Sequence, residues 1–563
     1  MIHTTQHKPV FKQVMIILAS IQTLTWFFIV WKHTIFEEWD GVMQFYSGQT
    51  LVQTHHYTGW ASHFWPPLQP LLLSLGHPLF IGKCVACVSG GISLICLYQI
   101  AKILQAKSPL FVVIALYSLS IFTKNFSVVE NHALETALYL SSVTLFLYFM
   151  RYQVAWYLYA SAVTVALACL TRYTSYSLFA SMVLYLLYHP NLKRKQKILY
   201  SIQYTSITLF ILSPWLISNS ISNGHPFATW QYLNIGSAVY PGSTAEWWWN
   251  IQTHYHGITE IIGDYPLEYL INFVGNLIES MIILLASPWG GYSWSCIISG
   301  FILYLIYRTD RQTFKPDLQV HTNSIRFLVF ASCFYILLAA NAFVFLEALL
   351  PIIFIFMVLF LVSVEKNLHH NQYSKYMYYF VVLHMCVSAY HGWKYIDNQR
   401  THNQLYAHQT VYQTIKKQII KKQINPSTTL SSLPPQVPHT PSLNNPLALK
   451  YPHITILSIH PTHAYELKTQ WIMAPLAQMK SLCDVIHYRV SDKVFHYAPK
   501  SNFDLQASQV QIHYLIITKG LAKVWPFISN DLMIDTNDAC FEQVHSLYKD
   551  QGVHIVEVLK SSR

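Results

Sequence analysis

Charged residues are scarce in this sequence. They make up 11% of its 563 residues, whereas soluble domains usually carry about 25%. The shortage lies between roughly residues 14 and 393, and ordinary polarity returns after them. This distribution excludes a single large soluble enzyme and indicates one membrane unit followed by a soluble tail.

Recognisable metal and redox motifs are lacking too. Cys84 and Cys87 sit in an apolar run with no second ligand pair, so small core residues are the simpler interpretation. His55 and His56 lack a third ligand. We therefore expect no metal and no other cofactor.

The formal net charge of +11 comes largely from short basic clusters beside apolar runs, at 193–197 and 308–315. Such clusters are topology signals, and they argue against nucleic acid as a partner.

Apolar runs long enough to cross a bilayer need about 20 residues. The sequence predicts eleven spans, at 13–33, 80–104, 109–123, 133–150, 154–171, 173–190, 198–218, 288–307, 325–345, 347–365 and 376–393. The first is interpreted as a retained helix because no small-residue cleavage site follows it. Basic loops placed inside put the 34–79 loop and the tail outside, although lysines between 416 and 422 weakly favour an inside tail.

Residues 266–287 are apolar at helical spacing but also carry Asn272, Asn276 and Glu279. This pattern predicts an amphipathic helix lying in the membrane interface rather than a twelfth span.

The tail begins after a proline-rich linker at 425–446. Short apolar runs predict strands at 454–459, 485–490, 514–518 and 553–559, alternating with helical stretches at 470–482 and 540–550. The predicted domains are a membrane unit (1–393), a juxtamembrane helix with the linker (394–449) and a small extracytoplasmic α/β domain (450–563). A disulfide between Cys483 and Cys540 can form if this domain lies outside.

Three carboxylates, Glu37, Glu38 and Asp40, follow the first predicted span directly. If the loop begins as a helix, Glu37 and Asp40 share one face at the membrane surface. A solvated helix end is the simplest interpretation of such charges, because a wet interface tolerates them.

Four segments in order resemble the GT-C superfamily of polytopic glycosyltransferases, which use polyprenyl-phosphate sugars. The acidic loop runs through an aromatic helix to FWPPLQP (64–70), as in the first external loop of that superfamily. VVENHALETALYL (128–140) is similar to its second acidic loop, LACLTRYTSYSLF (167–179) to its "LTRY" hairpin, and residues 213–240 to the segment after its seventh span. The resemblance implies a mainly α-helical membrane bundle with juxtamembrane helices.

The resemblance also implies roles for particular residues. Asp40 is the expected general base for the acceptor hydroxyl, and Glu37 or Glu130 the expected stabiliser of an oxocarbenium-like transition state. Where many relatives carry an arginine before the tenth span, this chain has Glu347. Arg172 is therefore the remaining candidate for the donor phosphate.

Simpler interpretations of these residues stay open. Arg172 can be a snorkelling interfacial arginine, and Glu130 and Glu135 can be helix-start carboxylates. The expected substrate contacts are Tyr57, Trp60 and His63.

The sequence thus predicts an inverting glycosyltransferase of the inner (plasma) membrane that acts on its outer face. It would move a sugar from a polyprenyl phosphate to a lipid, glycan or protein hydroxyl. The alternatives are a transporter or flippase, a metal-dependent oligosaccharyltransferase and a non-catalytic scaffold. Transporters favour repeated halves and midplane charges, whereas the ionisable residues here gather on the predicted external face.

Overall fold

A computed structural model describes residues 39–54, 57, 64–117, 119–229, 231–239, 255–286, 319–341, 347–368, 390, 413–418, 451–458, 469–473, 496–497, 514–518, 534, 541–550 and 553–558. The chain divides into two compact units. The first comprises Met1–Thr34, Gln44–Tyr240 and Tyr255–Ile396, and the second comprises Ile35–Met43, Pro241–His254 and Asp397–Arg563.

The described part of the first unit is helical, as the sequence predicts. Its α-helices are α2 (Trp39–Thr54, shared with the second unit), α4 (Leu68–Leu73), α5 (Pro78–Ile103), α6 (Pro109–Tyr117), α7 (Ser120–Asn125), α8 (Asn131–Tyr152), α9 (Ala155–Cys169), α10 (Tyr176–Tyr188), α11 (Arg194–Asn223), α12 (Gln231–Val239), α14 (Ile258–Asp264), α15 (Pro266–Ala286), α17 (Gln319–Ala339) and α18 (Leu350–Leu368). Two 3₁₀ turns, η1 (Tyr173–Ser175) and η5 (Glu347–Leu349), precede α10 and α18.

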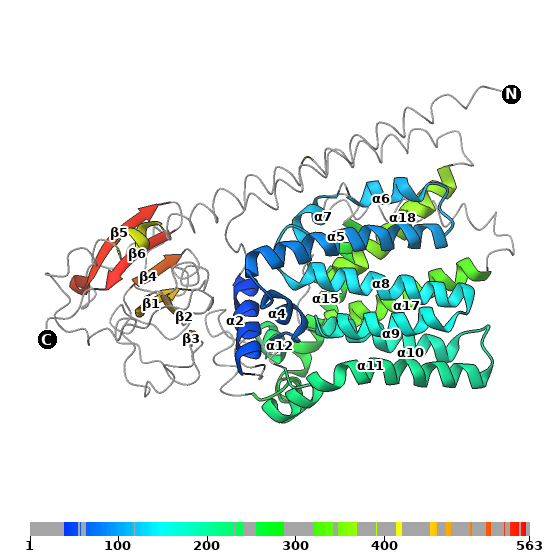
Figure 1. Cartoon of the computed structure of the whole chain (residues 1–563), viewed down its shortest axis with the longest axis horizontal. Helices are drawn as coiled ribbons and strands as arrows, with labels where there is room; N and C mark the ends of the chain where they lie inside the picture. Colours follow the sequence, from blue (N-terminus) through cyan, green and yellow to red (C-terminus); the bar gives the residue numbers. More distant parts are fainter. Residues whose placement is uncertain are drawn as a thin grey trace, which may run out of the picture. The chain divides into compact units, whose positions relative to one another are not determined.

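The long helices form a bundle around α8. Figure 1 shows α5, α8, α9, α10 and α11 running side by side, and α8 packs directly against α5 and α9. The core holds large, fully buried side chains, among them Tyr139, Phe146, Tyr204 and Tyr335. Burial of this apolar and aromatic surface holds the helices together.

Two glycines permit close approaches at one end of the bundle. A Cβ added at Gly48 of α2 would lie 1.9 Å from the carbonyl oxygen of Pro70. One at Gly82 of α5 would lie 2.3 Å from the Val129 side chain. Both contacts need a residue without a side chain, so these glycines fix the first loop and the segment before α8 against neighbouring helices.

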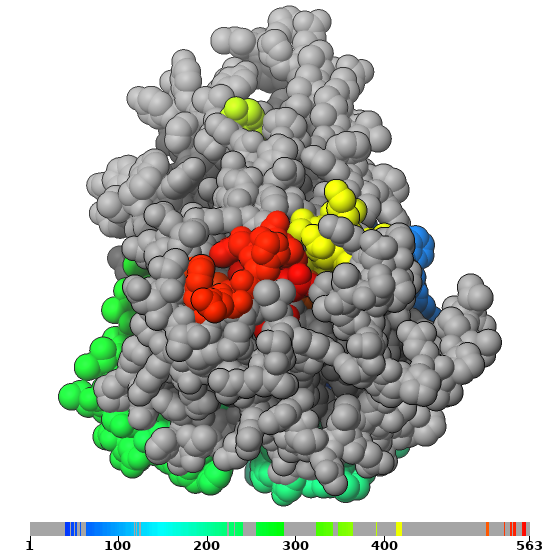
Figure 2. Space-filling model, turned by 90° about the vertical axis from the view of Figure 1, so that its left-hand side faces the viewer, coloured from blue at the N-terminus to red at the C-terminus, as the bar shows by residue number. Residues whose placement is uncertain are grey.

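Three of the described helices, α5, α8 and α15, are long and apolar enough to cross a membrane. In α15 the exposed side chains include Leu270, Ile271 and Val274, whereas Asn276 and Ser280 are buried. Its apolar face thus points outward, and Figure 2 shows α14 and α15 (green) at the surface. An outward apolar face suits contact with lipid, whether the helix lies in the interface or spans.

The second unit contains a six-stranded mixed sheet of β1 (Tyr451–Ser458), β2 (Thr469–Met473), β3 (His496–Tyr497), β4 (Tyr514–Thr518), β5 (Val544–Asp550) and β6 (Val553–Val558), with a 3₁₀ turn, η9 (Phe541–Gln543). The strand order is β3-β2-β1-β4-β6-β5. The β1–β2 and β1–β4 pairs are parallel and the other pairs antiparallel. Parallel neighbours require crossover connections, as in α/β domains.

Three local predictions differ from this structure. The predicted helical stretches 470–482 and 540–550 contain strands β2 and β5, because short apolar runs do not distinguish the two states. The single span predicted at 109–123 is two helices, α6 and α7. The predicted spans 13–33, 288–307 and, apart from residue 390, 376–393 lie outside the described residues, as do Cys483 and Cys540.

Candidate functional site

The first turn of α8 supplies one side of the candidate site. Glu130 is the N-cap residue, with extended backbone angles (φ −140°, ψ 162°) and no hydrogen bond from its side chain to the helix. Asn131 and Glu135 are four residues apart, so they share one face of the helix. Both are buried, with exposed fractions of 2% and 0%.

The turn between α9 and α10 supplies the other side. Arg172 follows α9 in extended conformation and caps the 3₁₀ turn η1. Its Nη1 donates to Asn131 Oδ1 at 2.9 Å and lies 3.1 Å from His132 Nε2. Its Nε lies 3.2 Å from Glu135 Oε2. The side chain is 16% exposed, so Arg172 is fixed within a polar network and does not snorkel.

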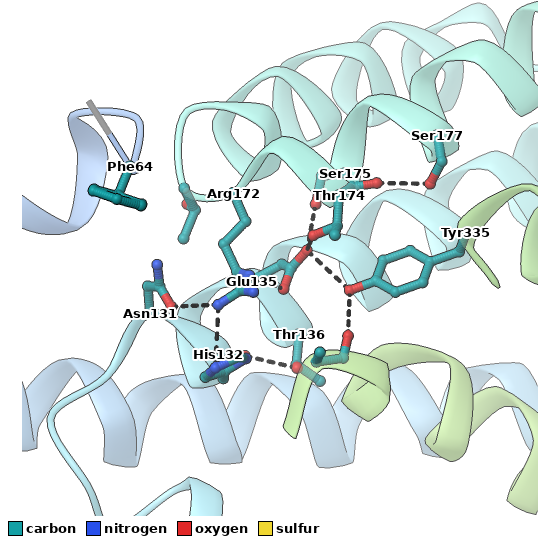
Figure 3. A network of polar contacts seen from close by, with 12 residues as sticks. Phe64, Asn131, His132, Glu135, Thr136, Arg172, Thr174, Ser175, Ser177 and Tyr335 are labelled. Atoms are coloured by element: carbon teal, nitrogen blue, oxygen red, sulfur yellow. Dashed lines mark hydrogen bonds and ion pairs between the residues drawn. The ribbon is translucent and has the colours of Figure 1, made fainter. Parts of the chain in front are cut away.

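Glu135 accepts hydrogen bonds from side chains of two helical segments, η1 and α17 (Figure 3). Its Oε1 accepts hydrogen bonds from Thr174 Oγ1 at 2.5 Å and Ser175 Oγ at 3.0 Å, both in η1. The Tyr335 hydroxyl of α17 lies 3.3 Å from the same oxygen and donates to the Ala348 carbonyl of η5 at 2.7 Å. A buried carboxylate is stable only when paired and hydrogen-bonded, and Glu135 has both kinds of partner.

The ion pair leaves the cluster formally neutral but keeps part of the guanidinium available. Within the part of the chain that the structure describes, Arg172 Nη2 makes no hydrogen bond. A guanidinium held by Nε and Nη1 is preorganised, so a ligand that meets Nη2 need not order the side chain itself.

The first loop packs onto the same turn. The Leu68 amide, in FWPPLQP, donates to the Leu170 carbonyl at 2.9 Å, two residues before Arg172. Gln231 of α12 donates from Nε2 to the Phe64 carbonyl at 2.8 Å. Three of the four segments that resemble the GT-C superfamily are therefore joined to one another by hydrogen bonds, and α8 joins them through Arg172.

Tyr57 belongs to this framework. Its ring packs edge-on against Trp215 of α11, with ring centroids 5.6 Å apart, and its hydroxyl donates to the Trp65 carbonyl at 3.1 Å. Burial raises the pKa of the Tyr57 hydroxyl well above its ordinary value, so the group stays a neutral donor.

Two buried amides near the turn have polar atoms without partners in the described structure. They are Nδ2 of Asn131 and both side-chain polar atoms of Gln69, the residue after Leu68. Unpaired buried donors are rare in proteins and cost about 1–3 kcal/mol each. Asn131 contacts Arg172, so the unpartnered Nδ2 of Asn131 suits a polar ligand at that point.

The predicted site residues fall into three groups. Arg172 lies in the network, Glu130 is half-buried at the start of α8, and Tyr57 is buried beside Trp215. Asp40 is half-buried in the first turn of α2 and belongs to the second unit. Glu37, Trp60 and His63 lie outside the described residues.

The sequence did not single out Asn131, Thr174, Ser175 and Tyr335, and it offered Glu135 only as a helix-start carboxylate. The sequence did contain a signal for Glu135, because a residue four positions after Asn131 lies on the same face of a helix. Tyr335 has no local signal, because it is 200 residues from Glu135 in sequence.

Among the described residues, no three His, Cys, Asp or Glu side chains are grouped so that they could hold a metal ion. His55 and His56 lie outside that set.

Comparison with known proteins places this geometry in context. The family model for dolichyl-phosphate-mannose-protein mannosyltransferase matches residues 65–217. No curated protein sequence gives a significant match.

Solved structures match over nearly the whole chain. ArnT from Cupriavidus metallidurans bound to undecaprenyl phosphate is 10% identical, with a TM-score of 0.52 over 96% of this chain and 97% of that one. Its apo state gives 10% identity and a TM-score of 0.53 over 97% and 98%. The Archaeoglobus fulgidus oligosaccharyltransferase tethered to an acceptor peptide with the NVT sequon is 12% identical. Its TM-score is 0.50, and the match covers 98% of this chain and 74% of that one. The resemblance to GT-C membrane glycosyltransferases is thus confirmed, and the chain has their fold.

Proposed function

We propose that this protein transfers a sugar from a polyprenyl-phosphate donor to an acceptor hydroxyl at the extracytoplasmic face of the inner (plasma) membrane. The observation that carries the proposal is Arg172, which Glu135 and Asn131 hold in place with part of its guanidinium open. The match to the mannosyltransferase model spans all three residues. The undecaprenyl phosphate bound to ArnT, a protein of the same fold, supports the choice of lipid.

In the proposed reaction the acceptor oxygen attacks the anomeric carbon from the face opposite the phosphate. The bond between that carbon and the phosphate oxygen breaks, and its electron pair leaves with the polyprenyl phosphate. Asp40 takes the proton of the acceptor hydroxyl, and the configuration at the anomeric carbon inverts. Glu37 or Glu130 stabilises positive charge on the sugar ring, and Arg172 stabilises the leaving phosphate.

Tyr57, Trp60 and His63 are proposed to contact the substrate, and the reaction is proposed to need no metal. The sheet-containing tail is proposed to tune acceptor choice or stability from outside the membrane, because it lies beyond the match to the mannosyltransferase model.

The test uses purified full-length protein in lipid, supplied with a panel of polyprenyl-phosphate sugars and candidate acceptors. We expect one donor to yield free polyprenyl phosphate and an acceptor carrying the inverted sugar linkage, with and without a metal chelator. Loss of transfer on chelation would instead favour a metal-dependent oligosaccharyltransferase mechanism. Movement of intact donors across vesicle membranes without cleavage would contradict the proposal.

A further inference from the structure

The start of α8 combines three features that favour a bound anion. The positive end of the macrodipole of this 22-residue helix lies there, and the side chain of the N-cap residue makes no capping hydrogen bond. The Arg172 guanidinium reaches the same turn and contacts Asn131.

The third feature is the Asn131 amide itself. Its Oδ1 is occupied by Arg172, which fixes the orientation of the group. Its Nδ2 is buried and has no partner in the described structure. In Figure 3 this nitrogen points away from the guanidinium, toward the side on which Phe64 lies.

Within the described structure, the two side-chain nitrogens of Asn131 and Arg172 that make no hydrogen bond, Nδ2 and Nη2, are both donors. An amide NH₂ and a guanidinium nitrogen cannot accept hydrogen bonds, so the complementary ligand atoms are acceptors. Glu135 neutralises the formal charge of Arg172, and a neutral cluster tolerates a singly charged group without requiring a dianion. The diester phosphate of a polyprenyl-phosphate sugar carries one negative charge and meets both conditions. The monoester undecaprenyl phosphate offers the same acceptor oxygens with close to two negative charges at pH 7.

We infer that Asn131 is a second phosphate-binding residue, whose Nδ2 donates to the phosphate of a polyprenyl-phosphate ligand beside Arg172. The inference rests on the proposed function for the choice of lipid.

The experiment measures binding of undecaprenyl phosphate to the purified full-length protein, with undecaprenol, which lacks the phosphate, as ligand control. Asn131→Asp keeps Oδ1 as the acceptor for Arg172 but replaces the donating nitrogen by a charged oxygen. Asn131→Ala removes both. The matched control is Asn125→Ala, since Asn125 is also buried but its Nδ2 already donates to the Ile121 carbonyl at 2.9 Å.

We expect Asn131→Asp and Asn131→Ala to weaken phosphate-dependent binding tenfold or more, the range of a hydrogen bond to a charged group. Asn125→Ala should leave binding unchanged. Binding of undecaprenol should be unchanged in every variant, because this ligand offers no phosphate to residue 131. Weaker binding of undecaprenyl phosphate together with unchanged binding of undecaprenol is a combination that a purely structural role would not produce.

The outcomes separate the two proposals. If the unaltered protein binds undecaprenyl phosphate more tightly than undecaprenol and both Asn131 variants bind equally well, water satisfies Nδ2 and only this inference is wrong. If the unaltered protein shows no preference for the phosphate, both this inference and the choice of donor fall. Should Asn131→Ala fail to fold, Asn131→Leu replaces it, because leucine is close to asparagine in shape and has no polar side-chain atom. Asn131→Asp alone does not decide, since its charge would repel a phosphate even if Nδ2 made no hydrogen bond to it.

Discussion

The ion pair between Arg172 and Glu135 makes a prediction that separates stability from activity. Arg172→Met removes the cation and leaves the fully buried Glu135 carboxylate with its hydroxyl donors alone. Glu135→Gln/Arg172→Met removes both charges but keeps an amide oxygen that Thr174 and Ser175 can still contact. The two variants differ by one charge.

The expected cost follows from the surroundings of Glu135. Breaking a buried ion pair from one side typically costs about 3–5 kcal/mol. Thr174 and Ser175 still donate to Oε1, which favours the lower end of that range. Protonation of Glu135 limits the loss of stability, because keeping a glutamic acid with an ordinary pKa of about 4.3 neutral at pH 7 costs about 3.7 kcal/mol. We therefore expect Arg172→Met to lose about 3–4 kcal/mol.

The double variant should recover most of that loss, since replacing both members of a buried pair is often close to neutral. Thermal and denaturant unfolding in detergent would compare both variants with the unaltered protein, and a donor-transfer assay would run in parallel. We expect the double variant to be folded yet to need far more donor, because the proposed phosphate-binding cation is absent. The Glu135→Gln single variant completes a double-mutant cycle, which measures the interaction energy between Glu135 and Arg172.

Two results would refute this account. If Arg172→Met were as stable as the unaltered protein, the pair would not be buried as described. If the refolded double variant bound donor with unchanged affinity, Arg172 would be structural only.

Three further predictions concern the framework around the site. Gly48→Ala should destabilise the protein by about 1–3 kcal/mol in unfolding experiments, since its Cβ would meet the Pro70 carbonyl, whereas Gly91→Ala, with nothing within 4 Å, should be neutral or mildly stabilising. Equal effects of the two would disprove the close approach. Tyr57→Phe should lower stability by about 0.5–1.5 kcal/mol through its lost hydrogen bond to Trp65, measured in the same way, and an unchanged melting temperature would argue against that bond. Cysteine labelling in intact cells should find residues 44–60 and 450–560 accessible from outside and residues 192–197 only from inside, and a protected tail would remove the eleven-span topology.

Local pattern was sufficient to predict the helices but not the contacts that complete the site. The apolar runs that predict α5, α8, α9 and α11 are long, and length is what makes such a prediction secure. The segments around 64–70, 128–140 and 167–179 were recognised one by one, and the structure joins them through Leu68, Leu170 and Arg172.

The sequence could not predict contacts between residues that are far apart in the chain. In the sequence, Glu135 is one of many carboxylates near a helix start. Its ion pair with Arg172 and its contact with the Tyr335 hydroxyl are seen only in the folded structure. The unpaired Nδ2 of Asn131 is a property of burial, which only packing determines. In the tail, the stretches 470–482 and 540–550 were assigned to helices, but β2 and β5 form there, because short segments take the state that their neighbours in a sheet impose.

The central claim is that a carboxylate at the membrane surface acts as general base in sugar transfer, and the transfer rate of Asp40→Asn tests it most directly. Asparagine keeps the shape of the side chain but cannot accept the proton, and a general base is typically worth about 10²–10⁴-fold in rate. At saturating donor we expect turnover to fall by that factor while donor binding, assigned to Arg172, survives. An Asp40→Asn protein that is folded and still transfers sugar at more than about a tenth of the unaltered rate would contradict the claim.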